Sequence, residues 1–272
     1  MNKKRIADYL QLAIRASLEA GLQVLEIYSK EFDVDFKEDK SPLTIADTAS
    51  HKIIEKYLTT TGLPVLSEEG KEIPFAVRKN WNVFWMVDPL DGTKEFIKRN
   101  GEFTINIALI QDRKPVLGVI YIPVQHLLYF GCEYTGSIKV TNAGETNDYD
   151  TTEAWVRAGK KLPLKTNRSI YTVVGSKSHL TPETKDYIDR LEMKHGRIDV
   201  LSRGSSLKIC MIAEGSADIY PRFAPTMEWD IAAGHAIVKF AGCAITDINT
   251  GNELEYNGET LVNPWFIAQR ST

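Results

Sequence analysis

Four short apolar runs constrain the fold of this chain more than any other feature. They are "VFWMV", "FTINIALI", "VLGVIYIP" and "LLYFGCE", and turns such as "QDRKP" separate them. Apolar runs of this length, bounded by turn residues, are typical of buried strands, and short connections favour antiparallel neighbours. We therefore predict a mostly antiparallel sheet in the first half of the chain.

Helical patterns precede this sheet, and the second half has a different texture. Apolar residues recur at helical spacing from Leu10 to Tyr28, and a second helix is predicted over 45–58. Residues 133–168 are polar and show little periodicity. Strand and helix patterns then alternate through "YTVVGS", a helix from Pro182, "IDVLS", a helix from Gly204, "ADIYPRF", "DIAAGHAIVKFAG" and "CAITDI". This alternation predicts an α/β second half over 156–272, joined to an α+β first half over 1–155.

Composition excludes several classes of protein. The 272 residues are 43% hydrophobic, enough for one large domain or two in tight contact. A net charge of −3 argues against a nucleic-acid groove, and three cysteines without a CxxC pair argue against disulfides or thiolate zinc. No apolar run of about 18 residues and no signal-like N-terminus occur, so we predict a cytoplasmic protein. The sequence indicates no stable protein partner and no membrane association, although peripheral attachment at the inner membrane face is kept as an alternative.

Acidic residues gather at junctions between the predicted elements. Several carboxylates in one place repel one another unless a divalent cation lies among them, and hard oxygen ligands favour magnesium. Turn dipeptides and a helix N-cap explain each acid equally well when it is taken alone. The acids are Glu68 and Glu69 in "LSEEG", Asp88 and Asp91 in "DPLDGT", and Glu228 and Asp230 in "EWDIAAGHA".

Taken together, these motifs resemble a known family. "SPLTIAD", "LSEEG", "DPLDGTKEF", "NGEFTINIALI", "GVIYIP", "VVGSKSH", "GSSLK", "AEGSADIYPRF" and "PTMEWDIAAGHAIV" follow one another nearly end to end. The order is similar to that of the 3'(2'),5'-bisphosphate nucleotidase branch of the inositol monophosphatase superfamily. This resemblance implies an α/β (α+β) layered sandwich with alternating helix and sheet layers, and a magnesium-dependent, lithium-sensitive phosphatase.

The resemblance also implies roles for individual residues. The carboxylates of Glu68, Asp88, Asp91 and Asp230 and the carbonyl of Leu90 bind two or three magnesium ions. Thr93 passes the proton of the attacking water to Asp47, and Glu68 and Asp91 belong to the same catalytic group. Glu69 and Glu228 are assigned supporting roles outside the metal shell. The residues expected to touch substrate are Glu68, Leu90, Asp91, Gly92, Thr93, His179, Ser205, Lys208, Arg222 and Asp230.

The implied substrate is a small nucleotide bisphosphate, because a second anion site is needed only if the substrate carries a second phosphate. The expected reaction removes the 3'-phosphate of 3'-phosphoadenosine 5'-phosphate, and also of the 5'-phosphosulfate, which clears a by-product of sulfate assimilation. An inositol monophosphatase or sugar bisphosphatase remains an alternative, as does a non-catalytic nucleotide or metal sensor. "GSSLK" and "YPRF" favour the nucleotidase, and the complete set of acids argues against the sensor.

Overall fold

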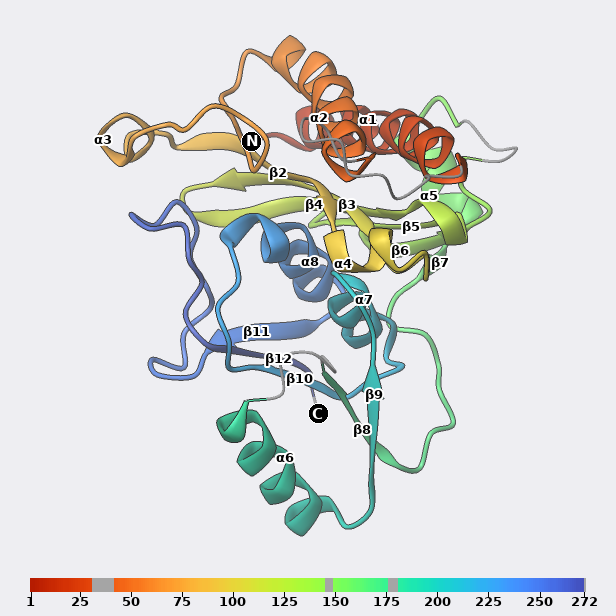
Figure 1. Ribbon diagram of the computed structural model, residues 1–272, viewed down its shortest axis with the longest axis vertical. Helices are drawn as coiled ribbons and strands as arrows, with labels where there is room; N and C mark the ends of the chain where they lie inside the picture. The colour runs from red at the N-terminus through yellow and green to blue at the C-terminus, as the bar shows by residue number, and fades with distance from the viewer. Residues whose placement is uncertain (31–41, 145–148, 176–180, 272) are drawn as a thin grey trace.

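The protein stacks helices and sheets in five alternating layers (Figure 1). The computed structural model describes residues 1–30, 42–144, 149–175 and 181–271. Helices α1 (Lys3–Ser29) and α2 (Pro42–Leu58) cover one face of a seven-stranded sheet, and α6 (Pro182–His195) covers the outer face of a five-stranded sheet. Between the sheets lie α7 (Leu207–Glu214) and α8 (Glu228–Phe240). This confirms the predicted layered sandwich.

The seven-stranded sheet contains all four predicted apolar strands. Its order is β1-β2-β3-β4-β5-β6-β7, antiparallel throughout except for the parallel pair β1 and β2. The strands are β1 (Val65–Ser67), β2 (Val83–Asp91), β3 (Thr104–Gln111), β4 (Lys114–Ile122), β5 (Leu127–Cys132), β6 (Gly136–Thr141) and β7 (Lys160–Lys161).

The polar stretch 133–168 holds more regular structure than its sequence indicated. It contains β6, α5 (Thr152–Ala158) and β7, and both of these strands pair within the first sheet. The division between residues 155 and 156 stays a prediction.

The five-stranded sheet is mixed. Its order is β11-β12-β10-β8-β9, with β8 parallel to both β9 and β10 and the other pairs antiparallel. The strands are β8 (Tyr171–Gly175), β9 (Ile198–Ser202), β10 (Ile219–Arg222), β11 (Cys243–Asp247) and β12 (Phe266–Arg270). The parallel pairs follow from the predicted strand and helix alternation, whereas β12 was not predicted.

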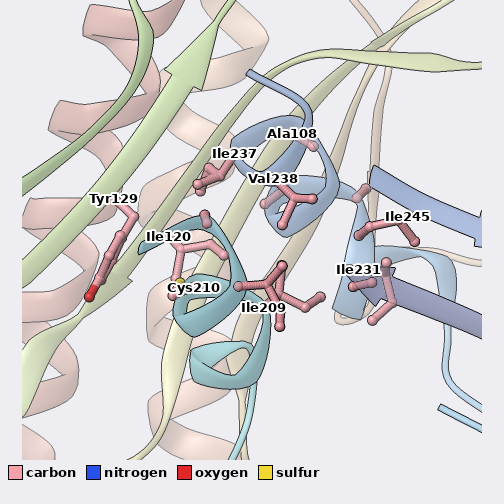
Figure 2. Close-up of a cluster of buried hydrophobic side chains, with 14 of the residues drawn as sticks. Ala108, Ile120, Tyr129, Ile209, Cys210, Ile231, Ile237, Val238 and Ile245 are labelled. Atoms are coloured by element: carbon pink, nitrogen blue, oxygen red, sulfur yellow. The ribbon is translucent and has the colours of Figure 1, made fainter. Parts of the chain in front are cut away.

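An apolar core around α8 joins the two sheets. Figure 2 shows Ile231, Ile237 and Val238 of α8 among side chains of the first sheet, α7 and β11. Burying a side chain of this size contributes about 1.5–3 kcal/mol. Helix α8 lies very close to β4, because a Cβ on Gly118 would fall 2.2 Å from the carbonyl oxygen of Ala233. This packing fixes the first turn of α8 against the end of β2, where the candidate site lies.

The α-helices of the described residues that lie outside these layers are short. Among them are α3 (Phe75–Arg78) and α4 (Thr93–Ile97), which flank β2 in sequence. No helix in the described part of the chain has the length and apolar character needed to cross a membrane.

Candidate active site

An irregularity at the end of β2 positions the acids of "DPLDGT". The register against β3 shifts between Asp88 and Asp91, where Pro89 lies. Proline is tolerated in a sheet at such a bulge because it has no N–H to donate. Asp88 accepts a hydrogen bond from the backbone N–H of Leu90 at 3.1 Å. Gly92 then turns the chain into α4 with φ 104°, a conformation that favours glycine, and a Cβ there would lie 2.1 Å from Ser205 Oγ.

Three carboxylates from three elements converge beside this turn. Ligand oxygens of Glu68, Asp88 and Asp230 all lie within 4.8 Å of one another, and the predicted ligand Asp91 is not part of this group. Glu68 follows β1, which pairs in parallel with β2 and so ends beside Asp88. Asp230 lies in the first turn of α8, where its Oδ2 accepts a 2.9 Å hydrogen bond from the N–H of Met227. Asp230 therefore caps its helix and also faces the other acids.

Proximity and burial raise the pKa values of these acids. Burial, and then repulsion from Asp91, Glu68 and Asp230, hold the pKa of Asp88 well above its usual range. Burial and the charge of Asp91 raise the pKa of Asp230 to about 7. Desolvation also raises the pKa of Glu68. Ionising all three together is therefore unfavourable unless a positive charge joins them.

The donor set fits a divalent cation. It consists of carboxylate oxygens with the short separations that one ion, or a pair of ions, can bridge. Oxygen ligands select magnesium, calcium or manganese over softer metals. The raised pKa values have the same physical origin, since a bound cation supplies the charge that relieves the repulsion.

Asp91 lies at the edge of a cavity of about 540 Å³ that opens beside the acids. A volume of this size suits a small organic ligand. The cavity lies between α4 of the first half and the 202–231 region of the second half. Of the residues predicted from the sequence, Asp91, Gly92, Thr93, Ser205, Lys208, Arg222 and Asp230 line it.

Five cationic side chains line the same cavity, together with the four carboxylates of Asp91, Glu95, Glu102 and Asp230. Arg222 donates from Nη2 to the carbonyl of Pro225 at 3.0 Å, and its buried Nε has no hydrogen-bond partner among the described residues. The cations are Lys94, Lys98, Arg203, Lys208 and Arg222. Of the three clustered acids, Asp230 lines the cavity, so the cluster and the cationic side chains meet in one site.

Comparisons with known proteins agree with this architecture. A sequence profile of the Inositol monophosphatase family matches residues 6–271. The chain belongs to the inositol monophosphatase family.

Relatives within the family resemble the chain over most of its length. It is 44% identical to the 3'(2'),5'-bisphosphate nucleotidase CysQ of Escherichia coli strain K12 over 252 residues, which is 91% of this chain and 94% of the relative. It is 42% identical to the Salmonella typhimurium protein of the same name, over 94% of this chain and 98% of the relative. The crystal structure of CysQ from Bacteroides thetaiotaomicron, described as a bacterial member of the inositol monophosphatase family, superimposes with a TM-score of 0.93 at 50% identity, covering 97% of both chains.

Three further residues, Asp47, Thr93 and His179, were expected from the family resemblance to take part in catalysis or to contact substrate. Asp47 lies on α2, and burial together with the charges of Glu69 and Glu68 raises its pKa to about 7. Thr93 is the first residue of α4, which packs against α2. His179 lies outside the described residues, so its predicted contact with substrate stays a prediction.

The ammonium group of Lys208 already has hydrogen-bond partners within the protein, which its position in "GSSLK" did not indicate. Its side chain is buried, and Nζ donates to the carbonyls of Ser205 at 2.7 Å and Arg203 at 3.2 Å. Burial lowers its pKa, while the nearby Asp91 raises it. Lys208 therefore holds the 203–205 turn in place as well as lining the cavity.

Two buried polar networks near the site were not predicted. In the first, Glu228 accepts from the N–H groups of Asn257 and Gly258 at 2.6 and 2.7 Å, and Arg78 donates to Asn257 Oδ1 at 2.9 Å. These contacts tie the start of α8 to the 257–259 loop, which agrees with a supporting role for Glu228.

The second network joins Thr104, Asn106 and Ser206 to Asp91. A sequence signal for it exists, because Thr104 and Asn106 are two apart in "FTINIALI" and so lie on one face of an otherwise apolar strand.

Proposed function

We propose that this chain is a magnesium-dependent 3'(2'),5'-bisphosphate nucleotidase that releases the 3'-phosphate of 3'-phosphoadenosine 5'-phosphate, giving AMP and phosphate. The observation that carries the proposal is the composition of the cavity. A cluster of carboxylates that needs cations reaches the cavity through Asp230, and five cationic side chains line the same cavity. A substrate with two separate phosphates satisfies both.

The carboxylates of Glu68, Asp88, Asp91 and Asp230 and the carbonyl of Leu90 would hold the magnesium ions. Bound magnesium supplies charge neutralisation of the phosphate and a lowered pKa for water. Short acidic side chains at a strand end, on a β-bulge and in the first turn of a helix hold their positions well, which suits a site whose geometry must persist through catalysis.

Asp47 and Thr93 are the proposed proton carriers. Asp47 lies close enough to Glu68 and Glu69 for their charges, after burial, to raise its pKa in the metal-free protein, which places it beside the carboxylate cluster. We assign Thr93 Oγ1 the role of passing the proton of the attacking water toward Asp47. The packing of α2 against α4 supports this assignment, because it brings the two helices that carry these residues together.

Arg222 is the strongest candidate for the second phosphate. It lines the cavity and is only half-buried, and a guanidinium offers several donors in a fork that matches phosphate oxygens. Lys208 contributes positive charge from behind the 203–205 turn. Names of the close relatives support the same substrate class, since those proteins are called 3'(2'),5'-bisphosphate nucleotidases.

The proposal is tested by measuring phosphate release from a panel of substrates, with magnesium and with EDTA. The panel holds 3'-phosphoadenosine 5'-phosphate, its 5'-phosphosulfate, inositol 1-phosphate and fructose 1,6-bisphosphate. We expect the two nucleotides to have the highest kcat/KM and EDTA to abolish release. A preference for inositol 1-phosphate or the sugar would replace the nucleotidase with another phosphatase of the family, and no turnover of any substrate would favour a sensor.

A further inference from the structure

A buried chain of polar side chains leads from the core of the first sheet to Asp91. Thr104 and Asn106 on β3 are 0% exposed, and Ser206, just before α7, is 2% exposed. Asn106 Oδ1 accepts from the hydroxyl of Thr104 at 3.1 Å, and Asn106 Nδ2 donates to Ser206 Oγ at 2.9 Å. Ser206 Oγ donates to Asp91 Oδ2 at 3.0 Å.

Thr104 Oγ1 also lies 3.4 Å from Asp91 Oδ2, whereas the amide of Asn106 reaches this carboxylate through Ser206. Thr104 donates to Asn106, Asn106 donates to Ser206, and Ser206 donates to a carboxylate. Since Ser206 accepts from Asn106, its own single proton points away from the amide, toward the oxygens of Asp91 and Asp230. Hydrogen bonds aligned in this way polarise one another, and the last one, to a carboxylate, is charge-assisted.

The chain also connects the two halves of the molecule at the site. Thr104 and Asn106 belong to the seven-stranded sheet, whereas Ser206 belongs to the second half. Ser206 Oγ lies 3.0 Å from the backbone oxygen of Asp230 as well as from the side chain of Asp91. One hydroxyl therefore contacts two of the residues that we assign to the metal ions.

Polar side chains in an apolar strand are costly unless they are paired. A valine or leucine at position 106 would satisfy the packing of β3 without that cost. The hydrogen bond from the amide of Asn106 to Ser206 explains why an amide is present there. Outer-shell hydrogen bonds to ligating carboxylates commonly set the orientation of the ligand and hence the affinity for metal.

We propose that Asn106 is a positioning residue that acts through Ser206 to fix the Asp91 carboxylate for divalent-cation binding. It does not touch substrate. This inference rests on the proposed function to the extent that Asp91 is a metal ligand, and it predicts that Asn106 affects metal affinity more than it affects the stability of the fold.

The test is a titration of the metal-free, full-length protein with Mn²⁺, followed by the electron paramagnetic resonance signal of free Mn²⁺. The variants are Asn106→Ala, Ser206→Ala and the double variant. We expect each single variant to weaken Mn²⁺ binding about tenfold or more. Because Asn106 acts through Ser206, the double variant should lose no more than the weaker-binding single variant.

Ser137→Ala is the matched control. Ser137 is 0% exposed and its hydroxyl donates to the carbonyl of Ile237 at 2.6 Å, so it too links the first sheet to α8, but away from the acids. We expect it to lower the unfolding temperature about as much as Ser206→Ala does and to leave Mn²⁺ affinity unchanged. Should Asn106→Ala fail to fold, Asn106→Leu replaces it, because leucine has a similar shape and satisfies the packing of β3.

The outcomes separate the inference from the proposed function. If the wild-type protein binds no Mn²⁺, the metal site itself is wrong. If the wild type binds but Ser206→Ala binds equally well, the positioning role is overturned. Additive losses of Mn²⁺ affinity in the double variant would also overturn it, because Asn106 would then act independently of Ser206. An equal loss of affinity in Ser137→Ala would overturn it as well, because general loosening of the fold would then explain the effect.

Discussion

Neutralising Asp88 should stabilise the metal-free protein while removing its response to magnesium. Asp88 is 1% exposed and lies with Glu68 and Asp230 in a group whose ligand oxygens are all within 4.8 Å. Two unit charges at that separation repel by about 3.5 kcal/mol at an effective dielectric constant of about 20. Proton uptake relieves part of this repulsion, since each unit of pKa shift corresponds to about 1.4 kcal/mol.

We therefore expect Asp88→Asn to raise the free energy of unfolding of the metal-free protein by about 1–3 kcal/mol, or its Tm by roughly 2–8 °C. Asparagine has the same shape, and its amide oxygen can still accept the hydrogen bond from Leu90 N–H. Magnesium at about a hundred times its Kd should stabilise the wild type by about 2.7 kcal/mol. It should stabilise the variant far less, because one ligand is lost.

The assay is thermal unfolding followed by circular dichroism, in EDTA and in magnesium. Asp247→Asn is the matched control. Asp247 Oδ1 accepts a hydrogen bond from the N–H two residues along the chain, as Asp88 does, but Asp247 does not line the cavity. It should show neither the gain in EDTA nor the loss of the magnesium response. An Asp88→Asn protein that melts below the wild type in EDTA and gains as much from magnesium would refute the reasoning.

Four further predictions concern specificity, inhibition and pH. Arg222→Ala should lower kcat/KM about ten- to a hundredfold more on 3'-phosphoadenosine 5'-phosphate than on adenosine 3'-monophosphate, and an equal loss on both would place Arg222 outside the second phosphate site. Lithium should inhibit phosphate release in magnesium more than sodium at equal ionic strength, and equal effects would remove this claim, which rests on the family resemblance. The pKa of Asp230 is about 7, above its ordinary 3.8, so the metal-free protein loses stability as pH rises through this range, and the magnesium-induced rise in Tm should be larger at about pH 8 than at about pH 5.5. The hydrogen bond from His235 holds the pKa of Glu253 at about 2, below its ordinary 4.5, so this carboxylate contributes stability that is lost as pH falls from about 4.5. The free energy of unfolding of Glu253→Gln, measured in urea, should therefore fall less steeply over this pH range.

The strands of the first half were predictable because their residues are buried on both faces, and the connections from β3 to β4 and from β4 to β5 are short. β2 to β5 read as continuous apolar runs, which helices on both sides of the sheet explain. β12 escaped prediction because "FIAQR" is short and ends in polar residues, and its pairing with β10 and β11 comes from tertiary contacts. α5 and β7 were missed for the same reason, since each is short and lies in a polar stretch.

Three of the four predicted acidic ligands lie together, whereas Asp91 is not part of their group and its carboxylate accepts a hydrogen bond from Ser206. The structure brings Glu68, Asp88 and Asp230 together as expected, through the parallel pairing of β1 with β2 and the position of α8. Sequence patterns do not reveal the register shift in β2 or the hydrogen bonds that occupy Lys208. Both depend on packing between segments far apart in the chain.

The most direct test of the proposed function is the identity of the nucleotide product. Phosphorus NMR of wild-type protein with magnesium and 3'-phosphoadenosine 5'-phosphate shows which ester is cleaved, because AMP and adenosine 3'-monophosphate give distinct signals. If the carboxylate cluster acts on the 3'-phosphate while the cationic wall holds the 5'-phosphate, AMP and inorganic phosphate should be the products, and EDTA should stop their formation. Release of adenosine 3'-monophosphate, or cleavage that continues in EDTA, would contradict the account.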